Sequence, residues 1–205
     1  MAGILAKKLG MTQVFGEDGA VARVTVLEAG PCYVTAIRTT ERDGYDAVQL
    51  AFGAVREKAL SKPELGHLAK ASAPPLRHLC EFRGEGAGLT VGETVNADVF
   101  EPGQRVKISG TSKGKGFQGT VKRHRFSRGP VTHGSHNTRA PGSIGASAWP
   151  ARVMKGIRGP GQMGNKRVTQ RGLEVVEVRA AEHLLFIRGA VPGSRGGYVE
   201  VRTDG

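Results

Sequence analysis

A glycine-rich segment in the middle of the chain, residues 114–119, has the spacing G-x-G-x-x-G. In dinucleotide-binding proteins this spacing opens a helix after a strand, and an acidic residue about 20 positions later binds the ribose. A strand is predicted at 105–109, but after the glycine segment the next acidic residue is Glu174, which is too far away to bind the ribose. The protein-kinase and phosphate-loop motifs also fail, because their partner residues are missing. We therefore expect the glycine amides, flanked by Lys113 and Lys115, to contact phosphate groups without forming a nucleotide-cofactor site.

Histidine and cysteine are the remaining residue types that could support a reactive or metal site. His124, His133 and His136 lie within 13 residues, and the last two have a spacing that would allow them to bind one ion. No cysteine or acid accompanies them, so stacking on bases or binding to phosphate is the favoured interpretation. Cys32 and Cys80 are isolated and are expected to be reduced thiols. We predict no catalytic residue, no metal, no cofactor and no enzymatic activity.

The charge of the chain is concentrated in one segment. The 205 residues carry a formal net charge of +12, from 30 Lys and Arg against 18 Asp and Glu. Residues 102–173 contain no acid at all, yet they hold 15 basic residues, 14 glycines and five prolines. So few apolar residues remain that this stretch is not expected to build a core of its own. Exclusion of negative charge is expected where a polyanion surrounds the chain, so we predict that this segment binds nucleic acid.

The sequence on both sides of this segment has the pattern of short strands. Val24 and Val26, for example, alternate with polar neighbours, as in a half-buried strand. One helix is predicted near 61–71, where Ser61 and Glu64 have the spacing of a capping box. Further strands besides the one at 105–109 are predicted at 3–5, 21–27, 33–37, 47–52, 76–82, 173–178, 184–187 and 198–201.

Many short strands at this spacing favour a small β-barrel. The predicted fold class is therefore mainly β, with a long basic and mostly irregular loop inserted into the barrel. Residues 1–101 would form the first part of the barrel, with a small α+β excursion near 53–95. Residues 102–173 would form the loop, and residues 174–205 the closing strands.

Residues 110–119, together with Arg123, resemble the signature of the family of large-subunit ribosomal protein three, of the bacterial type. Five further blocks resemble this family in the same order along the chain: 3–13, 44–49, 139–145, 162–165 and 189–193. The resemblance covers nearly the whole chain. It implies a translation-factor-like β-barrel whose long loop runs into the large ribosomal subunit, with residues 142–151 near the loop tip.

The resemblance also implies a function and a set of partners. Family members are structural constituents of the large subunit in the cytoplasmic ribosome, where they help to nucleate early assembly. The implied partners are 23S rRNA, at its 3′ region and near the peptidyl-transferase centre, and ribosomal proteins fourteen and nineteen of the same subunit. No membrane and no small-molecule substrate is expected. A free-standing nucleic-acid chaperone or DNA-binding barrel, and a nucleotide-using enzyme, are the competing hypotheses.

The candidate rRNA-binding residues are the cations, histidines and tryptophan of the basic segment. They are Lys113, Lys115, Lys122, Arg123, His124, Arg125, Arg128, His133, His136, Arg139, Trp149, Arg152, Lys155, Arg158, Lys166 and Arg167. Trp149 has two open interpretations, stacking on a base or packing between loop strands.

Two positions depart from the family pattern. Lys107 stands where the signature usually has Asp or Asn, and Ala146 stands where many bacterial members have a Gln that can be N-methylated. Because Ala146 has no side-chain amide, no such modification is expected there.

Overall fold

The computed structural model describes residues 3–16, 19–84 and 88–204. The chain divides into two compact units. The first unit combines Met1–Ser112 with Arg167–Gly205, and the second is Lys113–Lys166. Both ends of the second unit therefore lie inside the acid-free segment, whose outer parts belong to strands of the first unit.

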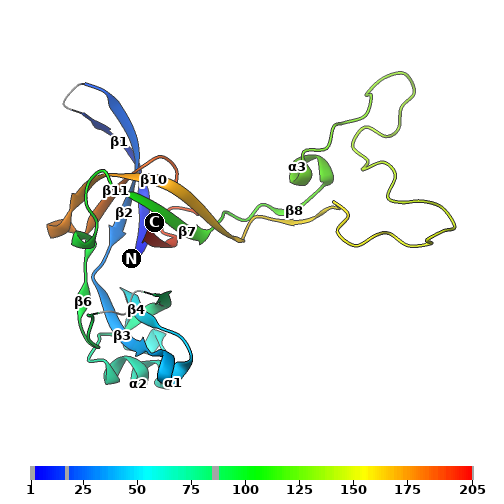
Figure 1. Cartoon of the computed structure of the whole chain (residues 1–205). Coiled ribbons are helices and arrows are strands. Elements are labelled where there is room, and N and C mark those ends of the chain that lie inside the picture. The colour runs from blue at the N-terminus through cyan, green and yellow to red at the C-terminus, as the bar shows by residue number, and fades with distance from the viewer. Residues whose placement is uncertain (1–2, 17–18, 85–87, 205) are drawn as a thin grey trace. The chain divides into compact units, whose positions relative to one another are not determined.

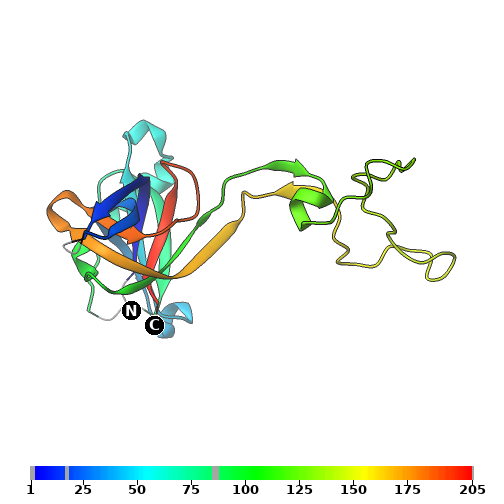
Figure 2. The ribbon, with the colours of Figure 1, turned by 90° about the horizontal axis from the view of Figure 1, so that it is seen from above.

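A closed barrel of six antiparallel strands forms the centre of the first unit (Figure 1). Around the barrel the strands follow the order β1, β12, β7, β10, β11, β2. Their bounds are β1 Gly3–Phe15, β2 Val21–Ala29, β7 Arg105–Thr111, β10 Arg167–Arg179, β11 Leu184–Arg188 and β12 Tyr198–Thr203. Figure 2 shows the first and last strands side by side, where Ile4 pairs with Val201. The sheet closes only because strands from both ends of the chain meet.

The barrel interior is filled by aliphatic side chains from different strands. Ile4, Leu27, Ile108, Leu185 and Val201 are fully buried and belong to one hydrophobic cluster. Burial alternates along β12 and the first part of β7, as the period-two pattern predicts. In contrast, β1 and β11 bury runs of consecutive residues, and in β2 Thr25 is fully buried whereas Val26 is only partly buried. Burial of this apolar surface is the main favourable contribution to folding of the unit.

A four-stranded sheet with the order β5, β4, β3, β6 forms the rest of the first unit. Its strands are β3 Cys32–Arg38, β4 Ala47–Ala54, β5 Leu76–Arg83 and β6 Thr94–Val95. The helices α1 Thr40–Asp43 and α2 Lys62–Lys70 and the 3₁₀ turns η1 Glu57–Ala59 and η2 Ala97–Val99 lie along the same stretch of chain; a third turn, η3 Ala180–Glu182, follows β10.

Helix α2 begins with the predicted capping box. The backbone N–H of Ser61 donates to Glu64 Oε2 at 2.7 Å, and its hydroxyl donates to the same oxygen at 2.8 Å. Leu68 is the buried residue of this helix and packs with Ala51 and Leu76 of the sheet. The cap fixes the start of this short helix, and the packing of Leu68 against the sheet contributes to holding it there.

The fold class predicted from the sequence is confirmed, since the structure is mainly β and contains a closed barrel. Each predicted strand corresponds to an observed one, but β10 begins at Arg167 rather than at 173. Its first six residues are exposed and Val168 is the only large apolar side chain among them, so the apolar alternation used for prediction is absent there. They are held by backbone pairing with β7, which does not depend on side-chain type. No helix in the described part of the chain is long and apolar enough to cross a membrane.

Candidate nucleic-acid interface

The second unit contains a short two-stranded ribbon, in which a strand near the start of the unit pairs with a strand near its end. Strand β8 Gly116–Gln118 pairs antiparallel with β9 Gly161–Met163. Next to the ribbon, Gly164 has a φ of +71° and lies against the carbonyl oxygen of Lys113. A side chain at position 164 would clash with that backbone oxygen, so glycine is required for the two chain segments to approach.

Helix α3, Thr120–His124, follows the ribbon and places two of the predicted RNA-binding residues. Arg123 Nη1 donates to the carbonyl oxygen of Gly159 at 2.8 Å, and His124 Nε2 lies 3.0 Å from the same oxygen. Both side chains are half-buried. A Cβ at Gly161 would lie 2.8 Å from Arg123 Nη1, so the absence of a side chain leaves room for the guanidinium. Arg123 and His124 therefore join the two arms of this unit.

Residues 125–160 contain no helix or strand. A few backbone contacts give this stretch local order, including Gly129 N–H donating to the carbonyl of Thr138 at 3.0 Å. Within residues 113–166, all of which are described, Thr120 is the only buried residue. The second unit therefore has no hydrophobic core, and a stretch of this composition cannot order itself by apolar burial.

The second unit carries eleven Lys and Arg and no Asp or Glu. No ion pair between side chains of this unit can form, since it contains no carboxylate. The predicted residues Lys113, Lys115, Lys122, Arg125, Arg128, His133, His136, Arg139, Trp149, Arg152, Lys155, Arg158 and Lys166 are all exposed here. The result is a long, irregular and exposed strip of one charge sign, which is the electrostatic pattern that a polyphosphate backbone recognises.

Fifteen of the sixteen predicted residues thus lie in the second unit, and Arg167 lies outside it. Arg167 is the first residue of β10 in the barrel, and its Nη2 donates to Glu200 Oε2 at 2.6 Å. Its charge already has a carboxylate partner on the barrel strand β12. Trp149 is 87% exposed, which leaves most of its ring free for stacking. His133 and His136 are exposed, and the described residues contain no group of three metal-ligating side chains.

Several exposed apolar side chains of the second unit were not among the predicted RNA-binding residues. Phe117, Val131, Ile144 and Met154 are between 56% and 75% exposed. The available signal was the presence of large apolar residues without helical or strand periodicity inside an acid-free segment. Side chains of this type remain in contact with water unless a ligand covers them.

Comparison with known proteins defines first the class and then the family. A family model described as Ribosomal protein L3 matches residues 88–185, so the class is that of a ribosomal protein. A protein from Synechococcus elongatus described as "Large ribosomal subunit protein uL3" is 54% identical, over 97% of this chain and 94% of the relative. A protein from Acidothermus cellulolyticus with the same description is also 54% identical, over 98% of this chain and 91% of the relative. The protein from Nostoc punctiforme with the same description is 52% identical over 97% and 95%. The chain belongs to the ribosomal protein L3 family.

This result confirms the resemblance inferred from the sequence blocks. The family consists of ribosomal proteins and not of enzymes, which also confirms the expectation that the chain has no enzymatic activity.

Proposed function

We propose that this protein is a structural constituent of the large ribosomal subunit, in the cytoplasmic ribosome, and that it binds large-subunit rRNA directly through the second unit. The observation that carries the proposal is the combination of eleven cations, no acid and no hydrophobic core within residues 113–166. RNA phosphates would supply the counter-charges that this unit lacks. The barrel, with its complete core, would dock as a preformed body.

The location proposed for the loop follows the family resemblance. The loop would run through 23S rRNA toward the peptidyl-transferase centre, and the protein would bind near the 3′ region of that RNA early in assembly. Ribosomal proteins fourteen and nineteen would be its protein neighbours. The irregular backbone and exposed side chains of residues 125–160 support this proposal, since such a segment can adopt the shape of an RNA cavity.

A salt titration of binding to 23S rRNA tests the electrostatic part of the proposal. If roughly 8–10 cations contact phosphate, the logarithm of affinity should fall with the logarithm of salt concentration with a slope of about −6 to −9. A slope near −2 would contradict the claim that the loop is the main anchor.

Matched charge variants test which unit provides the contacts. In the loop variant, Arg139, Arg152, Lys155 and Arg158 are all replaced by Gln, which should reduce the slope by about 3–4. The control replaces four exposed cations of the first unit, Arg56, Lys58, Lys62 and Lys70, by Gln and should leave the slope unchanged. Equal effects of both variants would show that the binding is not specific to the loop.

Sedimentation distinguishes the ribosomal role from a free nucleic-acid chaperone. The protein should remain with large subunits at moderate salt. Its recovery in the free fraction or on DNA would favour the chaperone.

A further inference from the structure

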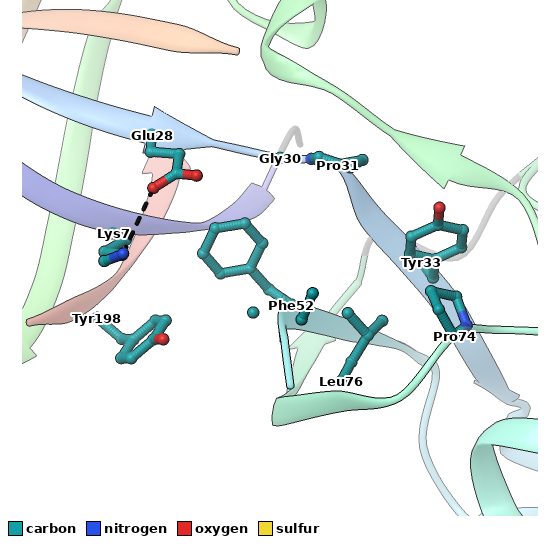
Figure 3. Close-up of a pocket in the computed structure, with 11 residues that line it drawn as sticks. Lys7, Glu28, Gly30, Pro31, Tyr33, Phe52, Pro74, Leu76 and Tyr198 are labelled. Atoms are coloured by element: carbon teal, nitrogen blue, oxygen red, sulfur yellow. Dashed lines mark ion pairs between the residues drawn. The ribbon is translucent and has the colours of Figure 1, made fainter. Parts of the chain in front are cut away.

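A pocket lies in the first unit between the barrel and the four-stranded sheet, and all of its lining residues belong to that unit (Figure 3). Its volume is about 300 Å³. This is at the lower end of the roughly 300–1,000 Å³ of small-molecule sites, and fits a ligand no larger than a nucleoside. Figure 3 shows Phe52 near the middle of the lining, with Lys7, Glu28 and Tyr198 on one side and Tyr33 on the other.

The aromatic wall of the pocket is packed against neighbouring rings although part of it faces solvent. Tyr198 is 36% exposed as a residue, and its ring centroid lies 3.5 Å from that of His78 and 6.0 Å from that of Phe52. Gly53 has a φ of +84°, and a Cβ at that position would make a tight contact of 3.2 Å with the Tyr198 hydroxyl oxygen. An exposed aromatic ring that is fixed by packing is the kind of surface on which unstacked bases are bound.

The polar wall of the pocket provides one cation and one anion with unused hydrogen-bonding capacity. Lys7 Nζ lies 3.8 Å from Glu28 Oε2, which is an ion pair but too long for a hydrogen bond. The two side chains are 40% and 41% exposed. An ammonium has three donors and a carboxylate accepts at two oxygens, so both groups can bind a ligand that enters the pocket.

We propose that this pocket binds a single unstacked guanine base of the rRNA. Guanine presents two adjacent donors, N1–H and N2–H, next to the O6 acceptor on its Watson–Crick edge. Glu28 would accept from both donors, Lys7 would donate to O6, and Tyr198 would stack on the ring. The other bases lack two adjacent donors beside an acceptor, so they cannot satisfy the carboxylate in this way.

The charge of the pocket favours a base over a phosphate group. Lys7 and Glu28 neutralise each other, so the site has no net attraction for an anion. The inference rests on the proposed rRNA binding, but it concerns the barrel and not the basic loop. It therefore predicts a second contact with RNA, at a site whose two charged side chains carry no net charge.

Chemical probing of large subunits that contain the full-length protein tests the proposal. A dicarbonyl reagent of the kethoxal type modifies N1 and N2 of guanines whose Watson–Crick edge is free. Glu28→Gln should raise the reactivity of one 23S rRNA guanine that is protected in wild-type subunits. Tyr198→Ala should expose the same guanine, because loss of the stacking contact should weaken binding of the base about five- to a hundredfold. Tyr198→Phe keeps the ring and should retain the protection.

The matched control is Glu174→Gln, which removes a barrel carboxylate that pairs with Arg188 outside the pocket. An unchanged guanine pattern in Glu28→Gln subunits would overturn the pocket proposal, and so would the same change in the control. Either result would leave the ribosomal role intact, because the protein would still be present in the subunits. Absence of the wild-type protein from large subunits would instead refute the proposed function.

Discussion

Arg167 and Glu200 form a 2.6 Å hydrogen-bonded ion pair at the point where the chain returns from the basic unit to the barrel. Arg167 is the first residue of β10, and Glu200 lies on β12. Both strands are neighbours of β7, whose last residue, Thr111, is paired with Arg167. The pair therefore stabilises the end of the barrel from which the basic unit departs.

Because Arg167 already has a carboxylate partner, its replacement should differ from that of a loop cation. Arg167→Gln should lower the free energy of unfolding by about 0.2–1 kcal/mol, since the Arg167 side chain is 62% exposed. Its effect on the salt dependence of RNA binding should be small. Arg158→Gln should show the reverse pattern, with unchanged stability and a slope reduced by about 1. Denaturant unfolding and salt titration of both variants measure this difference.

A double-mutant cycle with Glu200→Gln isolates the pair itself. A coupling energy of zero between the two substitutions would contradict a stabilising role for this ion pair.

The barrel should fold without the basic unit. Thr111 and Arg167 are directly paired, so replacing residues 112–166 by Asn-Gly would join β7 and β10 with a two-residue hairpin turn. All six barrel strands and their core remain in this variant. We expect near-native circular dichroism and cooperative thermal unfolding, together with a large loss of rRNA affinity.

One result for the same deletion would contradict independent folding of the barrel. Loss of the β-type circular dichroism spectrum would show that the barrel needs the second unit in order to fold. A Gly-Gly turn in place of Asn-Gly is the control for a defect in the turn itself.

The thiol of Cys32 should be unreactive in the folded protein. Cys32 is fully buried, and burial raises the pKa of its thiol to about 12. At pH 8 the thiolate fraction should then be roughly a thousandfold lower than in the unfolded chain, where the pKa is about 8.5. Iodoacetamide labelling followed by mass spectrometry should modify Cys32 only after denaturation.

The same raised pKa has a consequence for stability. The protonated thiol is favoured in the folded state, so this contribution is complete below about pH 8.5 and is lost as the pH rises toward 12. Cys32→Ala should remove this part of the alkaline destabilisation. An identical alkaline profile in both proteins would show that Cys32 is not its cause.

The capping box of α2 predicts a response to acid. The hydrogen bond from the backbone N–H of Ser61, and then that from its hydroxyl, hold the pKa of the Glu64 carboxyl below its usual range. The stabilisation is therefore present above about pH 4.3, the unfolded value, and is lost as the pH falls through the lower folded pKa. Glu64→Gln should flatten this part of the acid unfolding profile, and NMR titration of the Glu64 carboxyl measures the shift directly.

Ala146 should remain unmodified in the mature protein. Its side chain is a methyl group and has no amide nitrogen that could accept a further methyl group. Mass spectrometry of the peptide that covers residues 142–152 should give the unmodified mass, and detection of a methylated peptide would contradict this prediction.

Local features of the sequence were sufficient to predict most of the first unit. Short apolar runs located the strands, because alternation along a half-buried strand reflects its own side chains. The Ser61 and Glu64 spacing located a helix start, because a capping box involves residues only three positions apart. Strands β8 and β9 were missed, since their three-residue pairing joins segments more than 40 positions apart and buries almost nothing.

In the candidate interface, too, local sequence patterns were informative and contacts between distant residues were not predicted. The absence of acids from residues 102–173 identified the charged segment, but it could not separate Arg167 from the loop cations. That separation depends on Glu200, which lies 33 positions further along and reaches Arg167 only after β10 and β12 both pair with β7.

The sequence by itself determined the kind of protein, namely a β domain interrupted by a segment that lacks acids and lacks the apolar residues needed for a core. These are properties of composition and of short-range spacing, so they do not depend on how the chain folds. Only the tertiary structure decided which cations already have carboxylate partners, how the strands close into a barrel, and that Lys7, Glu28 and Tyr198 line one pocket. These relationships join residues far apart along the chain, and they arise only when burial of the common core brings the strands together.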